Sequence, residues 1–165
     1  ELLASPLPRR WADSLQALHL RSSGITDAHM LALSGQHLPA LKSLDLAQNA
    51  LTADALNTLS TAPWWPQLET LALSRNRLAE ATSSSDDAEP ARLAAALTSL
   101  DLGHNHLSDD GLARLAPLLG APTLKRLGLG GNALSATDTL RAFLSQPQAL
   151  EALDLSAANL GDARL

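Results

Sequence analysis

Residues 97–107 read LTSLDLGHNHL, and this eleven-residue stretch decides the fold of the chain. Leucine stands at its first, fourth, sixth and eleventh places, and asparagine stands at the ninth. Because side chains on a strand point alternately to its two faces, Leu100 and Leu102 are predicted to point into a core and Asp101 to point away from it. The stretch therefore predicts a short strand followed by a turn at Asn105.

The same string occurs six times in the 165 residues. Its copies begin at Leu15, Leu41, Leu68, Leu97, Leu124 and Leu150, at intervals of 26 to 29 residues. All six fit the pattern L-x-x-L-x-L-x-x-N-x-L at the leucine places, with Ile25 as the single isoleucine. A unit of this size cannot bury its apolar face alone, so stacked copies are expected to share one core. The sequence predicts a single repeat domain over residues 1–165.

The asparagines at the ninth place are expected to form a second repeating feature. They are Asn49, Asn76, Asn105 and Asn132. A side-chain amide carries both donors and acceptors, so each is predicted to bond backbone groups of its own turn and of the neighbouring turn. The first and last copies have Ser23 and Ala158 instead. Since terminal repeats are usually atypical, the array is expected to end near both ends of the chain.

The segments between the strings have the features of helices. Thr26, Thr52 and Ser108 are good N-cap residues, and aspartates follow each of them. Apolar pairs then recur at helical spacing, namely Met30 with Leu33, Leu56 with Leu59, and Leu112 with Leu115. In the 29-residue unit a polar patch at 79–90 predicts an exposed loop at 82–85 and a helix delayed to about 86–96.

With these features the chain resembles leucine-rich repeat proteins over essentially its full length. Repeats of 26–29 residues that contain full helices resemble the ribonuclease-inhibitor-like class. The resemblance implies an α/β, right-handed leucine-rich-repeat solenoid, or horseshoe. Its parallel sheet would line the concave face, and its helices would line the convex face.

Composition excludes several classes of function. A net charge of −5 and a pI of about 5.4 argue against a nucleic-acid partner, and no apolar stretch is long enough to predict a membrane span. The absence of cysteine excludes disulfides and thiolate sites and favours an intracellular, cytoplasmic location. Arginine outnumbers lysine ten to two, which favours a bacterial source. Bacterial repeats of the resembling kind often belong to effectors delivered into host cells.

The search for catalytic or cofactor chemistry is negative, so no enzyme, metal or cofactor is predicted. No G-x-S-x-G, H-E-x-x-H or Walker-type loop is present, and the glycines at 128–131 lack the following helix that a phosphate loop needs. His104 and His106 with Asp101 are too few metal ligands, so surface histidines are favoured. Some relatives in the resembling family activate small GTPases through an arginine, but no local motif assigns that role to Arg75, Arg77 or Arg126.

The tryptophans leave two interpretations open. Trp11 and Trp64 each precede the first leucine of a repeat by four residues, which makes them equivalent and favours a packing role. Trp65 either packs in the same way or is partly exposed and anchors a partner, since exposed tryptophan is enriched in binding hot spots.

Side chains on the outer face of the predicted strands are candidate partner contacts. The charged ones are His19, Arg21, Asp45, Asp101, Arg126 and Asp154. The three aspartates share one place in alternate repeats, so neighbouring members lie roughly 10 Å apart at ~4.8 Å per strand. This spacing argues against a catalytic carboxylate pair and predicts a partly acidic stripe.

The eighth and tenth places lie just past each strand, on the rim. The third and fourth repeats carry Arg75, Arg77, His104 and His106 there, whereas the other repeats carry small or neutral residues. One hypothesis is that this rim binds an acidic partner segment, more tightly below about pH 6.5, where free imidazole takes up a proton. The alternative is ordinary solubilising charge.

The sequence predicts a non-enzymatic protein–protein interaction module that binds a protein partner through its concave face or rim. It is expected to be the recognition part of a larger bacterial effector, and a monomer. The alternative function is a structural or scaffold domain that self-associates through the exposed strands at the array ends.

Overall fold

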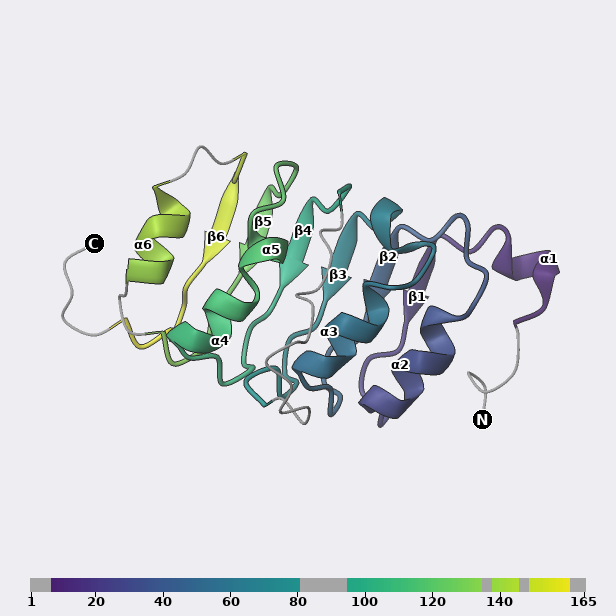
Figure 1. Cartoon of the computed structure of the whole chain (residues 1–165), viewed down its shortest axis with the longest axis horizontal. Helices are drawn as coiled ribbons and strands as arrows, with labels where there is room; N and C mark the ends of the chain where they lie inside the picture. The colour runs from purple at the N-terminus through teal and green to yellow at the C-terminus, as the bar shows by residue number, and fades with distance from the viewer. Residues whose placement is uncertain (1–6, 81–94, 135–137, 146–148, 161–165) are drawn as a thin grey trace.

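The structure is a computed structural model that describes residues 7–80, 95–134, 138–145 and 149–160. Its centre is one parallel sheet of six short strands in chain order (Figure 1). The strands are β1 (Ala17–His19), β2 (Ser43–Asp45), β3 (Thr70–Ala72), β4 (Ser99–Asp101), β5 (Arg126–Gly128) and β6 (Ala152–Asp154). Each strand consists of the third to fifth residues of one copy of the eleven-residue string. The predicted position of the strand within the string is therefore confirmed.

The register aligns equivalent places of neighbouring repeats. Leu18, Leu44, Leu71, Leu100, Leu127 and Leu153 stand opposite one another from β1 to β6. Every connection runs from one strand to the adjacent parallel strand, as expected for a solenoid. The prediction of an α/β leucine-rich-repeat solenoid is confirmed.

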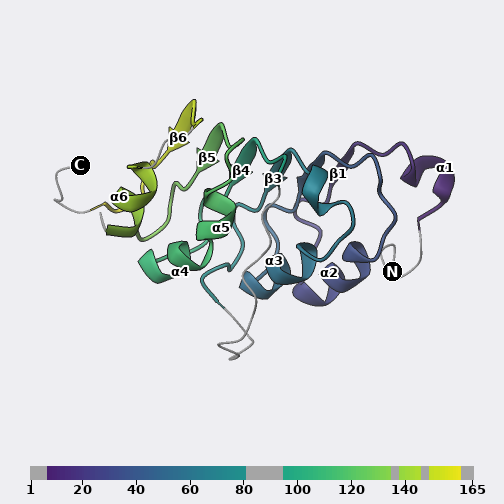
Figure 2. The same ribbon diagram turned by 45° about the horizontal axis from the view of Figure 1, so that its top comes forward.

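The helices cover one face of the sheet, and the other face of the sheet points outward (Figures 1 and 2). They are α1 (Arg9–Ala12), α2 (Asp27–Ser34), α3 (Ala53–Leu59), α4 (Asp109–Arg114), α5 (Ala116–Leu119) and α6 (Asp138–Leu144), with a short 3₁₀ turn η2 (Trp65–Gln67). None of the described helices is long and apolar enough to cross a membrane.

The predicted helix starts are confirmed. Thr52 Oγ1 accepts from the Asp54 N–H at 3.3 Å, and Ser108 Oγ accepts from the Gly111 N–H at 3.4 Å. At α2 the Thr26 N–H donates to the side chain of His29 at 3.1 Å. Such bonds satisfy amides that a helix terminus leaves without intrahelical partners.

Two helix predictions have other outcomes. The loop at 82–85 and most of the helix at 86–96 lie outside the described residues, whereas residues 95 and 96 form a turn rather than the end of a helix. The segment after α4 is also not one continuous helix, because α5 begins separately at Ala116. Pro117 stands in the first turn of α5, where proline is tolerated because no intrahelical N–H is needed.

The core consists of stacked leucines from strands and helices. The apolar helix pairs expected to face the sheet are buried, and so are the strand leucines of β2 to β5. Apolar burial of this kind contributes about 25 cal/mol per Å², so the repeated leucines supply most of the stabilisation.

Of the two interpretations left open for Trp65, packing is confirmed and partial exposure is wrong. Trp65 is 1% exposed and Trp64 is 2% exposed, because η2 turns this return segment onto the core. The Trp65 N–H donates to the Ala62 carbonyl at 3.0 Å, which fixes that turn. Trp64 therefore packs as predicted, whereas Trp11, its equivalent at the first repeat, is 38% exposed. Trp65 cannot anchor a partner on this surface.

Candidate functional site: sheet face and rim

The first candidate surface is the outward face of the sheet, built by the third, fifth and seventh places of each repeat. Asp45, Asp101 and Asp154 occupy the fifth place of β2, β4 and β6. Each carboxylate Oδ1 accepts from the backbone N–H two residues further on, at 2.9, 3.0 and 2.8 Å respectively. The aspartates therefore fix the end of their own strands in addition to carrying charge.

Hydrogen bonds also influence the ionisation of Asp154, the last of the three aspartates. Hydrogen bonds from the Ser156 side chain and backbone, with a smaller attraction from His104, hold the pKa of the Asp154 carboxyl below its usual value. A carboxyl with a lowered pKa stays ionised further into the acidic range. Asp154 is thus a stable negative charge at the exposed edge strand.

Small residues separate the aspartates for a steric reason. Gly128 stands between Asp101 and Asp154, and a Cβ at Gly128 would lie 2.9 Å from Asp101 Oδ1. A side chain at that position would displace the carboxylate. The glycines of this repeat accommodate neighbouring polar side chains and do not form a phosphate loop.

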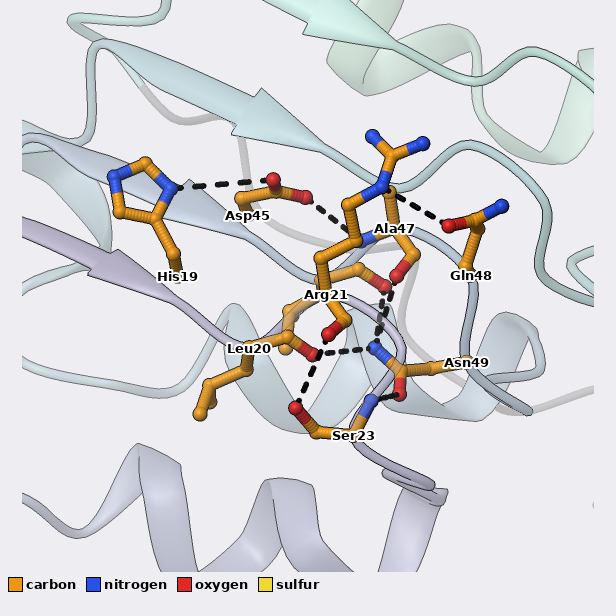
Figure 3. A network of polar contacts seen from close by, with 9 residues as sticks. His19, Leu20, Arg21, Ser23, Asp45, Ala47, Gln48 and Asn49 are labelled. Carbon is orange, nitrogen blue, oxygen red and sulfur yellow. Dashed lines mark hydrogen bonds and ion pairs between the residues drawn. The ribbon is translucent and has the colours of Figure 1, made fainter.

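At the N-terminal end of the sheet face each charged side chain has a partner in the adjacent repeat (Figure 3). His19 Nδ1 lies 3.9 Å from Asp45 Oδ2, and Arg21 Nε donates to Gln48 Oε1 at 3.0 Å. Ser22 Oγ donates to the same Gln48 oxygen at 2.9 Å. Two separate polar contacts, His19 with Asp45 and Arg21 with Gln48, therefore join the first two repeats.

Two further ion pairs join neighbouring strands at the second place of the repeats. Lys42 Nζ lies 2.8 Å from Glu69 Oε1, and Lys125 Nζ lies 2.8 Å from Glu151 Oε1. The hydrogen bond and charge of Lys125, with a smaller contribution from Arg126, lower the pKa of the Glu151 carboxyl. These exposed ion pairs contribute little to the stability of the fold. Arg126 takes part in neither pair, and its side chain is exposed on β5.

The second candidate surface is the rim, and its backbone has an unusual conformation. The eighth place of all six repeats has a positive φ, at Ser22, Gln48, Arg75, His104, Gly131 and Ala157. Only one of these residues is glycine, although a left-handed backbone is costly for residues that carry a Cβ. Nothing in the sequence predicts this turn, because the residue types at the eighth place share no preference for a left-handed backbone.

We call Arg75, Arg77, His104 and His106 the rim patch. All four side chains are exposed, and none forms a hydrogen bond or ion pair with the residues that the structure describes. The Arg75 N–H donates to the Gly103 carbonyl at 2.8 Å, which holds the third and fourth turns side by side. The structure therefore brings the predicted rim residues together as neighbours.

The rim patch has a defined boundary on its C-terminal side. The His104 ring lies over Gly131, where a Cβ would overlap it. Gly131 therefore leaves room for the imidazole, and the fifth repeat adds no side chain to the rim at this place. On the N-terminal side Gln48 is held by Arg21 and Ser22. Among the residues that the structure describes, the basic side chains of the rim that have no partner thus belong to the third and fourth repeats.

The predicted site residues fall into separate groups. His19, Arg21 and Asp45 lie together at one end, the rim patch lies in the middle, and Arg126 and Asp154 lie toward the other end. Asp101 lies on β4 between the last two groups. Among the described residues no group of three or more metal-ligating side chains could hold a metal ion.

The left-handed turn allows a matched test on the rim. Arg75→Gly should stabilise the fold by about 0.5–1 kcal/mol, because glycine relieves the positive φ of 58°. Arg77→Gly removes the same charge from a residue outside the left-handed region, so it should destabilise the fold by about 0.5–1 kcal/mol. Urea unfolding of both variants measures the difference. Equal changes in the unfolding midpoint would show that Arg75 is not strained.

Comparison with known proteins places this geometry in a family. The family described as the PRAME C-terminal domain matches residues 7–160. Tubulin-specific chaperone E of Danio rerio is 31% identical over 123 residues, which are 74% of this chain and 22% of the chaperone. Toll-like receptor 2 of Bison bison is 33% identical over 129 residues, which are 78% of this chain and 15% of the receptor. The chain thus spans less than a quarter of the length of either relative.

Among solved structures, internalin C2 of Listeria monocytogenes has a TM-score of 0.52 and 23% identity, over 90% of this chain and 65% of the internalin. This likeness shows the fold alone. Leucine-rich repeat homologues of this kind are typically protein-interaction modules. With the match over residues 7–160 and six stacked repeats, the chain belongs to the PRAME C-terminal domain family and is a leucine-rich repeat protein.

Proposed function

We propose that this domain is a non-enzymatic interaction module that binds an acidic segment of a protein partner through the rim patch. One observation carries the proposal. Two guanidinium groups and two imidazoles lie exposed on neighbouring turns of a chain whose net charge is −5, and none of them is paired with a residue that the structure describes. Basic side chains without a partner in the described part of the chain are available for an external one.

The chemistry of the four side chains suits a carboxylate-rich ligand. Arginine presents a rigid fork of donors that can bind a carboxylate through two hydrogen bonds. Each imidazole adds a further hydrogen-bonding nitrogen beside the two guanidinium groups.

The proposal also covers the location of the protein, the longer protein to which the domain belongs and the class of its repeats. We propose an intracellular location and a role as the recognition part of a longer bacterial effector, supported by the absence of cysteine and the excess of arginine over lysine. We also propose the ribonuclease-inhibitor-like class for the repeats. The 26–29-residue period and the helices α2, α3 and α6 of seven to eight residues support that assignment.

A double charge reversal tests the rim patch. The protein is first screened at low salt against an array of acidic, neutral and basic peptides, and the best acidic peptide is measured by fluorescence anisotropy. Arg75→Glu with Arg77→Glu should weaken binding of that peptide about 100-fold or more, because two charge-assisted contacts become repulsive. Binding should also weaken as salt is raised.

The matched control is Arg9→Glu with Arg10→Glu. These arginines are also exposed, they make the same change in net charge, and they lie on α1, outside the rim. The control should lower affinity only a few-fold through the overall field. Equal losses in the two double variants, with both folds intact by circular dichroism, would contradict a site at the rim patch.

A further inference from the structure

The sheet face beside the rim patch carries one negative charge. At the third, fifth and seventh places the third and fourth repeats present Thr70, Ala72, Ser74, Ser99, Asp101 and Gly103. Asp101 is the ionisable residue among these six. It ends β4, three residues before His104 of the rim patch, and it stands opposite Ala72 of β3, three residues before Arg75. The basic rim patch therefore borders a single carboxylate on the sheet.

Asp101 differs from the other two aspartates at the fifth place. Asp45 has its second oxygen 3.9 Å from His19 Nδ1, and the Asp154 carboxyl accepts hydrogen bonds from both the side chain and the backbone of Ser156. Asp101 Oδ1 accepts from the Gly103 N–H at 3.0 Å, but Asp101 Oδ2 has no hydrogen-bond or ion-pair partner among the residues that the structure describes. Of the three carboxylates, that of Asp101 is left with a free oxygen.

The residues around Asp101 leave its carboxylate accessible. A Cβ at Gly128 would lie 2.9 Å from Asp101 Oδ1, and a Cβ at Gly103 would lie 3.2 Å from the same oxygen. On the other side, the residue opposite Asp101 is Ala72. These three neighbours have no side chain long enough to cover the carboxylate, which is half-buried. An extended segment of a partner can therefore approach Asp101 closely.

The nearby basic side chains do not neutralise Asp101. Within the described part of the chain, neither the rim patch nor Arg126 of β5 forms an ion pair with it. At ~3.3 Å per residue, the three steps from Asp101 to His104 span at most about 10 Å. Opposite charges thus lie within reach of one short peptide, and each lacks a partner among the described residues.

We propose that the partner segment carries a lysine or arginine about three residues from its acidic run, and that this base binds Asp101 while the acidic side chains bind the rim patch. The inference rests on the proposed function and adds a specificity-determining residue to it. A segment that is acidic throughout would place a carboxylate beside Asp101, and like charges in contact are disfavoured. Asp101 therefore selects partners by the order of their charges and fixes the direction in which the segment lies.

Peptides that differ at one position provide the test. Each contains three glutamates, two glycines and then lysine, glutamine or glutamate, and each is also made in the reverse order, because either chain direction can place the base over Asp101. In fluorescence anisotropy at low salt, the lysine peptide of one order should bind about three- to fivefold more tightly than its glutamine counterpart. The glutamate peptide should bind no more tightly than the glutamine peptide.

Asp101→Asn should remove the preference for lysine, because asparagine can still accept from the Gly103 N–H but carries no charge. The matched control is Asp45→Asn, which makes the same change at the same place of the string, where the carboxylate faces His19. This control should retain the preference for lysine. Circular dichroism establishes that both variants are folded.

The rim variant Arg75→Glu with Arg77→Glu separates the two proposals. Suppose that it abolishes peptide binding, but lysine confers no advantage on the unaltered chain or keeps its advantage in Asp101→Asn. The role of Asp101 would then be overturned, and the rim patch would remain the site. If no peptide binds, or if the rim variant binds as tightly as the unaltered chain, the proposed function is contradicted and the role of Asp101 with it.

Discussion

Replacing Asn105 by alanine should destabilise the protein by about 3–5 kcal/mol, because the amide satisfies four or more buried backbone groups. Asn105 Oδ1 accepts from the Asn76 and Leu78 N–H groups at 3.1 and 3.4 Å. Its Nδ2 donates to the carbonyls of Leu73 and Leu102 at 3.0 and 2.9 Å. The side chain is fully buried, so water cannot replace these bonds.

The control for this prediction is Asn57→Ala. Asn57 lies on α3 and is only partly buried, and its amide forms no hydrogen bond with the described residues. Alanine also favours a helix over asparagine, so the loss of stability should stay below about 0.5 kcal/mol. Both variants are measured by urea denaturation. Similar unfolding midpoints for the two would mean that the asparagine ladder does not hold adjacent repeats together.

The ladder shows how far the sequence predicts this structure. An asparagine at a fixed place of a repeated string predicts an amide that bonds its own turn and a neighbouring turn. Asn49, Asn76, Asn105 and Asn132 all do so, and the neighbour is the preceding turn in each case. The prediction succeeds because the constraint is local and periodic. Each repeat has the same backbone path, so one inference about one turn applies to every copy.

Trp65 shows where this kind of prediction fails. The segment between the prolines at 63 and 66 interrupts the repeat, and its sequence does not reveal which of two adjacent tryptophans points inward. The structure buries both, Trp64 as the residue that precedes η2 and Trp65 as its first residue. Irregular return segments depend on tertiary packing, which periodicity does not encode.

The rim is predicted in position but not in conformation. Sequence spacing places Arg75 and His104 at equivalent turns, and the structure confirms that those turns are adjacent. The sequence does not predict the positive φ of 58° at Arg75 or of 55° at His104, since glycine occupies the eighth place in only one repeat, at Gly131. The geometry of the whole turn imposes this conformation on whatever residue the string places there.

Replacing Leu100 by alanine should cost about 2–5 kcal/mol, because the leucine is enclosed by the strands on both sides and a cavity remains after its truncation. Leu153→Ala makes the same chemical change at the same place of the string, but Leu153 is exposed to solvent and should cost below about 1 kcal/mol. Urea denaturation of the two variants measures both costs.

The two leucines differ in how completely they are enclosed. Leu100 is 1% exposed and lies between two neighbouring strands, whereas Leu153 is 36% exposed and has a described strand on one side only. Truncation therefore leaves a cavity at Leu100 and only a smaller apolar surface at Leu153. A cost for Leu153→Ala of the same size as for Leu100→Ala would mean that Leu153 is enclosed as fully as Leu100 in solution.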